Sequence, residues 1–223
     1  NASDLSGASI VTVTDGPVIA ADGVALNTLE VSLEGDDDAD VYTNVEFSVE
    51  DSAPAIAAEL DGLQGGSIDA LDGAESLVVS GGDTTVQGAA DIQSLSGIYD
   101  AANSDYAIED SSGAILASGN YNVVVDSGVE QVFVTDTVSV ADGVSLSDME
   151  VALEAERGAE TADIAFDVAG SASDIINNAS DLSGASIVTV TDGPVIAADG
   201  VALNTLEVSL EGDDDADVYT NVE

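Results

Sequence analysis

NASDLSGASIVTVTDGPVIAADGVALNTLEVSLEGDDDADVYTNVE is the sequence of residues 1–46, and it returns without a single difference at residues 178–223. A chain that folds as one closed globule has no use for a second identical copy of its first fifth. The chain is therefore interpreted as one full repeat period, residues 1–177, followed by the start of the next identical period. Arrays of this kind are more often stalks, fibres or adhesins than catalysts.

A shorter repeat lies inside the period. FSVEDSAPAI at 47–56, YAIEDSSGAI at 106–115 and FDVAGSASDI at 166–175 align, and the phrases VTVTD (11–15), LVVSG (77–81), VFVTD (132–136) and VTVTD (188–192) interleave with them. Each aligned copy has an aromatic residue, a serine and an isoleucine at fixed positions: Phe47, Tyr106 and Phe166; Ser52, Ser111 and Ser171; Ile56, Ile115 and Ile175. The period thus divides into three subunits, approximately 8–66, 67–127 and 128–186.

These phrases also predict the secondary structure. The β-branched, alternating runs are typical of strands, and each is followed by a helical piece, such as residues 89–95 or residues 52–60 with Ser52 as the N-cap. Strands about 30 residues apart predict a repeat protein, an α/β or β solenoid with short parallel strands and short helical pieces. About six coils per 177-residue period would rise by ~29 Å at ~4.8 Å per strand. Tandem β-sandwich beads remain the alternative, because the spacing of the strand phrases is uneven.

One stretch resembles a known family. DTTVQGAADIQSLSGIYDAANSDYAIEDSSGAILASG (83–119) is similar to the SDTAAN-like β-strand repeats of giant tandem-repeat surface proteins in marine cyanobacteria and green sulfur bacteria. Residues 106–111 stand where those repeats have YSISDT, and residues 111–115 stand where they have TAANI. The acidic run at 36–40 is not part of that pattern. The resemblance implies an extracellular or cell-surface protein of the adhesin or filament type, and it brings no catalytic residues.

Charge excludes several functions. The chain has 45 Asp and Glu residues against one basic residue, Arg157, and it has no His and no Cys. Binding to nucleic acid or to an anionic membrane is therefore not expected. Without His or Cys there is no Ser-His or Cys-His nucleophile system, and without Trp there is no rich aromatic platform for sugars, so the chain is not expected to be an enzyme. The carboxylates must be solvated or bridged by cations.

The acidic run GDDDAD at 35–40, repeated at 212–217, is the candidate metal site. The candidate ligands have the D-x-D-x-D spacing that opens an EF-hand loop: Asp36, Asp38 and Asp40, with Asp213, Asp215 and Asp217 in the second copy. Val41 occupies the position where that loop needs Gly, and Phe47 occupies its twelfth position, so an EF-hand is not expected. A looser Ca²⁺ site and a solvated acidic loop remain open as alternatives.

Asp-Gly pairs recur along the chain and are interpreted as turns: Asp15-Gly16, Asp22-Gly23, Asp61-Gly62, Asp72-Gly73 and Asp142-Gly143.

The whole sequence favours an extended polyanionic filament or stalk, secreted or on the cell surface, whose partner is a further copy of itself. Ten of the 45 acidic residues lie in the repeated tail, so one period has 35 acids, one Arg and a charge of −34. Over ~29 Å this is roughly one charge per 0.85 Å, denser than the ~1.7 Å of duplex DNA, so we expect stabilisation by cations such as Ca²⁺. A repetitive adhesin that attaches cells to surfaces or to one another is the alternative.

Overall fold

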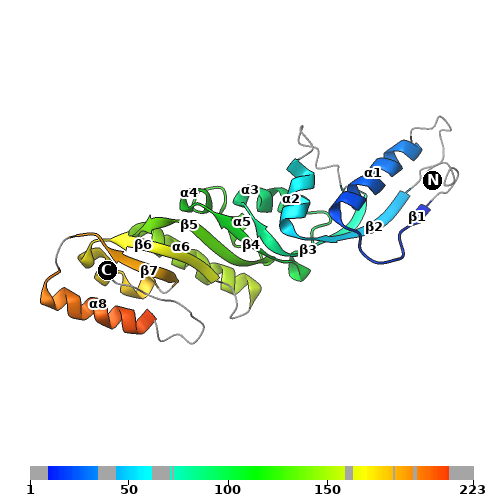
Figure 1. Ribbon diagram of the computed structural model, residues 1–223. Helices are drawn as coiled ribbons and strands as arrows, with labels where there is room; N and C mark the ends of the chain where they lie inside the picture. The colour runs from blue at the N-terminus through cyan, green and yellow to red at the C-terminus, as the bar shows by residue number, and fades with distance from the viewer. Residues whose placement is uncertain are drawn as a thin grey trace. The chain divides into compact units, whose positions relative to one another are not determined.

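The computed structural model describes residues 10–34, 44–61, 71, 73–158, 163–182, 184–192 and 195–210 (Figure 1). Seven strands belong to one parallel sheet in the order β1-β2-β3-β4-β5-β6-β7, which is also their order in the chain, and helices lie between them in sequence. The predicted α/β class with parallel strands is confirmed. Tandem β-sandwich beads are not supported, because such sandwiches are built from antiparallel strands. The chain divides into two compact units, residues 1–107 (unit 1) and residues 108–223 (unit 2).

Unit 1 alternates strands and helices. Its elements are β1 (Ile10–Thr12), α1 (Ala20–Glu34), β2 (Asn44–Asp51), α2 (Ala53–Asp61), β3 (Ala74–Thr84), α3 (Val86–Ser94), the 3-10 helix η3 (Ala101–Asn103) and β4 (Asp105–Asp110), which runs across the boundary between the units.

Unit 2 continues the same alternation. Its elements are α4 (Ser112–Ile115), α5 (Tyr121–Val124), β5 (Val129–Ser139), α6 (Val140–Arg157), β6 (Asp163–Gly170), α7 (Ala172–Asn177), the 3-10 helix η4 (Ala179–Asp181), β7 (Ala185–Val190) and α8 (Ala197–Leu210). No helix among the described residues is both long enough and apolar enough to cross a membrane.

Strand pairing follows one pattern in both units. β2 pairs with β3 in parallel, and the register shifts between Phe47 and Ser48. β6 pairs with β7 in parallel, and the register shifts at the aligned position, between Phe166 and Asp167. Both Phe rings are almost fully buried, as is the aligned ring of Tyr106 in β4. The aligned aromatic residues therefore form the core beneath the helices.

The aligned serines begin helices. Ser111 Oγ accepts a hydrogen bond from the N–H of Ala114 at the start of α4, and Ser171 Oγ accepts one from the N–H of Asp174 at the start of α7. Ser52 directly precedes α2, as predicted, and its carbonyl oxygen accepts from the N–H of Ile56 at 3.1 Å. The isoleucine four residues after each serine is fully buried: Ile56, Ile115 and Ile175. A capped first turn thus sets one apolar side chain into the core.

Two of the Asp-Gly pairs are not turns. Gly23 lies in the first turn of α1, and Gly143 lies in the first turn of α6, so the turn interpretation was wrong there. A Cβ atom at Gly23 would lie 3.0 Å from the side chains of both Leu71 and Val49. These glycines let a helix approach the sheet closely, at the cost of a weak helix former.

The same close approach is made in both units. A Cβ atom at Gly143 would meet Leu182, Phe166 and Val168, which align with the Leu71, Phe47 and Val49 that surround Gly23. By contrast, Gly16 has a φ of 105° and follows Asp15 in a bend, as the turn interpretation predicts.

Candidate functional site: the junction between periods

The junction between the two periods lies at β6 and β7 in unit 2 (Figure 1). β7 belongs to the second copy of the repeated segment, and its register places Val188 opposite Val168. Beyond the strand, the N–H of Thr191 donates to the carbonyl oxygen of Gly170 at 2.8 Å. At this junction the repeated segment therefore pairs with the strand that precedes it in the chain.

In the first copy, the same segment pairs with the strand that follows it. The register of β1 with β2 places Thr12 opposite Glu46, and the N–H of Val13 donates to the carbonyl oxygen of Glu46 at 3.0 Å. Val13 is the twin of Val190, which directly precedes Thr191. N–H groups of successive residues in a strand point to opposite edges. The edge of the segment that pairs with β2 in the first copy is therefore opposite to the edge that pairs with β6 in the second copy.

The helices that follow the two copies have different surroundings. α1 contacts β2, and its Gly23 lies where a Cβ atom would be 3.0 Å from Leu71 and Val49. The twin of Gly23 in α8 is Gly200, and among the described residues only Val195 comes within 4 Å of such an atom, at 3.9 Å. The glycine face of the helix is thus covered by the sheet in the first copy, whereas in the second copy the helix contacts α7.

Carboxylates from neighbouring strands hold the N-termini of helices. In each case an Asp in the next strand, or just beyond it, accepts a hydrogen bond from the first N–H of the helix. The pairs are Asp51 with Ala20 at 3.0 Å, Asp136 with Ser112 at 2.6 Å and Asp192 with Ala172 at 2.7 Å. The N–H groups at a helix start lack intrahelical partners and favour a negative charge.

Of these three carboxylates, Asp136 accepts two hydrogen bonds from the residue that begins its helix. The backbone N–H and the hydroxyl of Ser112 both donate to its carboxylate, and these bonds hold the pKa of Asp136 below its ordinary value. Part of the negative charge is therefore stabilised by peptide groups, without a basic side chain. The lone Arg157 donates to the carbonyl oxygen of Ser127 at 3.0 Å.

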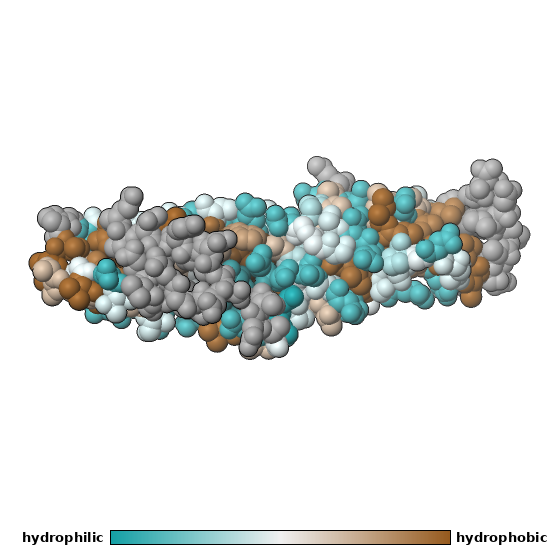
Figure 2. All heavy atoms as spheres, turned by 60° about the horizontal axis from the view of Figure 1, so that its bottom comes forward, coloured by the Kyte–Doolittle hydropathy of each residue, from teal (hydrophilic) through white to brown (hydrophobic). Residues whose placement is uncertain are grey.

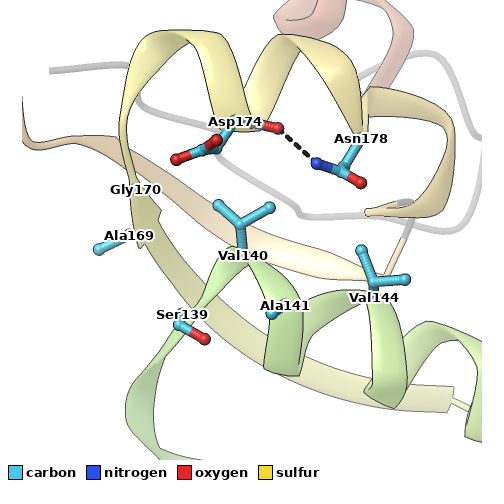
Figure 3. A pocket seen from close by; sticks show the side chains of 8 residues that line it. All are labelled: Ser139, Val140, Ala141, Val144, Ala169, Gly170, Asp174 and Asn178. Carbon is cyan, nitrogen blue, oxygen red and sulfur yellow. Dashed lines mark hydrogen bonds between the residues drawn. The ribbon is translucent and has the colours of Figure 1, made fainter.

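A pocket of about 620 Å³ lies where α6 begins, β6 ends and α7 passes (Figure 3). Its lining combines small and apolar residues with three polar ones: Ser139, Val140, Ala141, Val144, Ala169, Gly170, Asp174 and Asn178. The polar groups already serve the helices, since Ser139 caps α6 and the Asn178 side chain donates to the carbonyl oxygen of Asp174 at 2.7 Å. These eight residues do not assemble a nucleophile with a base.

Gly170 in the lining of this pocket makes room for a larger side chain on α6. In unit 1 the aligned residue is Asp51, which fits because Ala20 opposite it is small. In unit 2 the residue aligned with Ala20 is Val140, and its side chain occupies the space that a Cβ atom at Gly170 would need. The side chains at the two positions are therefore complementary in size: unit 1 combines a large Asp51 with a small Ala20, and unit 2 combines Gly170 with the larger Val140.

Glu150 of α6 and Asp163 of β6 form a carboxyl pair. Burial is the main cause that raises the pKa of Glu150 to about 7, and the charges of Asp163 and Glu154 add to it. Burial also raises the pKa of Asp163, which shares a hydrogen bond with Glu150. Sequence reasoning missed this pair. The position aligned with Asp163 in unit 1 is Asn44, so only the alignment of the subunits could have singled it out.

The predicted metal ligands, Asp36, Asp38, Asp40, Asp213, Asp215 and Asp217, lie outside the described residues. Within the part of the chain that the structure describes, no three acidic side chains gather in a group that could hold a metal ion. A Ca²⁺ site in the acidic run stays a prediction.

Comparison with known proteins leaves the chain without an assigned family. No family model matches it, and no curated protein or solved structure is significantly similar to it.

Proposed function

We propose that the chain is a piece of a tandem-repeat structural protein in which successive periods add to one continuous parallel sheet. The array would serve as an extended polyanionic filament or stalk, secreted or on the cell surface. The observation that supports this proposal most strongly is the use of opposite edges by one sequence. Thr191 donates to the strand before the repeated segment, while Val13, the twin of Val190, donates to the strand after it.

The way in which the strands are connected also supports a continuous sheet. The helix between β1 and β2 and the helix between β6 and β7 are both crossovers between neighbouring parallel strands. Such crossovers are right-handed in nearly all proteins, so each new strand is added in the same direction. A segment that meets β6 on one side therefore has its other side turned toward the next strand of the array. The sheet can continue through any number of periods.

The charge suits this role. With −34 charges in one period, the array would gather counterions, and divalent cations neutralise such density best. Ca²⁺ is the expected cation, with the acidic runs at 36–40 and 213–217 as its sites. The resemblance to giant bacterial surface proteins supports an extracellular place. The proposal assigns no reaction to the chain.

Chains of one, two and three periods, each with the same tail, test the proposal. Small-angle scattering should give a length that grows by ~29 Å with each period, since six strands at ~4.8 Å follow one another. Increments that vary with solution conditions, as for flexible beads, would contradict a continuous sheet. Thermal unfolding with Ca²⁺ and with EDTA at low ionic strength tests whether the cation stabilises the array. Equal melting temperatures would exclude such stabilisation.

The alternative is a repetitive adhesin. It is favoured by an exposed isoleucine that recurs once per period, Ile19 with 53% and Ile196 with 65% of its surface exposed. Replacing both with Ser should abolish binding to cells or surfaces if the array is adhesive. It should leave the length increment unchanged if the array is only a spacer.

A further inference from the structure

The pocket at the start of α6 has a carboxylate where the other two subunits have an apolar residue. In those subunits the strand ends in Asp and the following helix has Ala four residues later: Asp51 with Ala55, and Asp110 with Ala114. The phrase in unit 2 has Gly170 at the end of the strand and Asp174 in α7. Both residues line the pocket. The acidic group is therefore moved from the strand to the helix beside the pocket.

The side chain of Asp174 is held in place by the start of its own helix. Its Oδ2 atom accepts from the hydroxyl of Ser171 at 2.7 Å, and its backbone N–H donates to the same hydroxyl at 3.1 Å. This reciprocal pair of bonds is a capping box. The Oδ1 atom has no donor among the residues that the structure describes. One oxygen of the carboxylate thus serves the helix, and the other can accept from a ligand.

The opposite wall of the pocket is apolar. Val140 and Val144 belong to α6, and their side chains point toward the helix that carries Asp174 and Asn178 (Figure 3). Residues four apart in a helix are separated by ~6 Å along its axis, so each wall extends over about one turn. The side-chain N–H of Asn178 already donates to Asp174, which leaves its Oδ1 atom as a second acceptor. The pocket therefore combines an apolar strip with oxygen acceptors.

The elements on either side of the pocket are present in the structure. α6 contacts β5 and β6, and α7 contacts α8. The pocket therefore lies between consecutive helices within the array. Its volume of about 620 Å³ is within the range of sites that bind small molecules.

The lining selects one class of ligand. An anion would be repelled by Asp174, and the lining has no basic residue to attract it. Ca²⁺ takes roughly six to eight oxygen ligands, whereas the lining has a single carboxylate. A wholly apolar ligand would bury that carboxylate without a partner, which is costly. An organic cation with an apolar stem satisfies both walls.

We propose that this pocket binds a primary alkylamine, with the ammonium on Asp174 and the stem along Val140 and Val144. The side chain of lysine has this form, with a stem of about four carbons. The chain itself has no Lys, so the amine comes from another protein or from a free diamine. This site goes beyond the proposed array, to which it adds one amine site in each period.

Repetition would make such a site effective. A single exposed ion pair is weak, but a partner with several amines can occupy the sites of several periods at once. The surface around the site is not uniformly hydrophilic in spite of the charge. Figure 2 shows brown, hydrophobic surface next to teal, hydrophilic surface on unit 2, at the left of the view. Such a surface suits a ligand that is both apolar and cationic.

The test titrates the full 223-residue chain with butylamine at physiological ionic strength and follows methyl signals by NMR. The signals of Val140 and Val144 should shift and saturate. Butanol has the same stem without the charge, and its dissociation constant should be about tenfold higher or more. Val24 in α1 is aligned with Val144 and should not shift, because Asp51 already caps that helix.

Two variants test the assigned residues. Asp174→Asn keeps an acceptor for Ser171 but removes the charge, so the dissociation constant for butylamine should rise about tenfold or more. Ala141→Phe fills the pocket from an exposed position and should abolish the saturable shift without lowering the melting temperature. It keeps the test decisive if Asp174→Asn weakens α7. The matched control is Asp148→Asn, which removes the same charge from α6 outside the lining and should change the constant by less than about twofold.

Equal binding of butanol and butylamine would overturn the proposal, as would an unchanged constant for Asp174→Asn. A shift of Val24 as large as that of Val144 would also overturn it, because it would show that the amine is attracted by overall charge. Cadaverine and the blocked tripeptide Ala-Lys-Ala then distinguish the two sources. Tighter binding of the tripeptide indicates a lysine of a partner protein, and tighter binding of cadaverine indicates a free diamine.

Failure of the amine site would leave the proposed array intact, because the length increment does not depend on the pocket. Irregular increments would contradict the array and leave the pocket unaffected.

Discussion

Residues 10–33 and 187–210 have one sequence and two environments. In the first copy the strand pairs with β2 and the helix contacts β2. In the second copy the strand pairs with β6 and the helix contacts α7, while Val201 of this helix has 69% of its surface exposed. The element types are the same in both copies, so local sequence decides that a strand and then a helix form. Burial is decided by which neighbour is present.

The largest change should come from removing the ring beneath the covered helix. Phe47→Ala leaves a cavity under α1 and should cost about 3–5 kcal/mol in the free energy of unfolding of unit 1. Amide exchange measured by NMR should show lost protection in α1 and unchanged protection in α8. NMR is needed because peptides from the two copies have the same mass.

Phe166→Ala is the matched control for this change. The ring of Phe166 lies beneath α6 in unit 2, where it meets Gly143 as Phe47 meets Gly23. Loss of protection should then appear in α6 and not in α1. Equal loss in all helices after either substitution would contradict separate cores beneath them.

The glycine twins should give a smaller difference with opposite signs. Gly23→Leu forces a side chain against Leu71 and Val49 and should cost about 1–3 kcal/mol, whereas Gly200→Leu meets open space. Since Leu is also the better helix former, the second variant should be neutral or gain up to about 1 kcal/mol. Urea unfolding of the two variants at low protein concentration measures both. Equal destabilisation would show that the two helices have the same cover.

The smallest change should come from the carboxyl pair under α6, and it should depend on pH. Glu150 in the folded state has a pKa of about 7 against an ordinary 4.5, so the unfolded chain loses this proton first and stability falls as pH rises between these values. Glu150→Gln removes the free-energy cost of ionising this buried carboxyl group. After allowance for solvent screening, it should gain on the order of 1–2 kcal/mol at pH 8 and almost nothing at pH 4.

Asp148→Asn serves as the control for the pH effect. It removes one negative charge from the same helix at an exposed position. Chemical unfolding at the two pH values should show little change for this variant. A gain as large as that of Glu150→Gln would mean that overall charge, and not the buried pair, sets the pH dependence.

Much of the strand and helix order could be predicted from the aligned phrases. The phenylalanine, serine and isoleucine of FSVEDSAPAI predict a buried strand, a helix cap and a core contact, because each acts within a few residues of its neighbours. Gly23 was misinterpreted for the opposite reason. Its role depends on Leu71, which is far away in sequence, and next to Asp22 it looks like a turn.

Only the location of the candidate site could be predicted from the sequence. The junction at residue 178 follows from the duplicated sequence, but the choice of edge by Thr191 and Val13 does not, since it depends on hydrogen bonds to distant strands. The Asp51, Asp136 and Asp192 caps escaped prediction because each carboxylate lies 20 to 31 residues along the chain from the helix start that it serves. The carboxyl pair at Glu150 escaped for the same reason.

The central claim is that one sequence uses opposite edges in its two copies, and amide exchange of four residues tests it most directly. In dilute solution, the N–H groups of Val13 and Thr191 should be protected, because they donate to Glu46 and Gly170. Their twins in the other copy, Val190 and Thr14, should exchange quickly. The same protection pattern in both copies, with Val13 matching Val190 and Thr14 matching Thr191, would contradict the account.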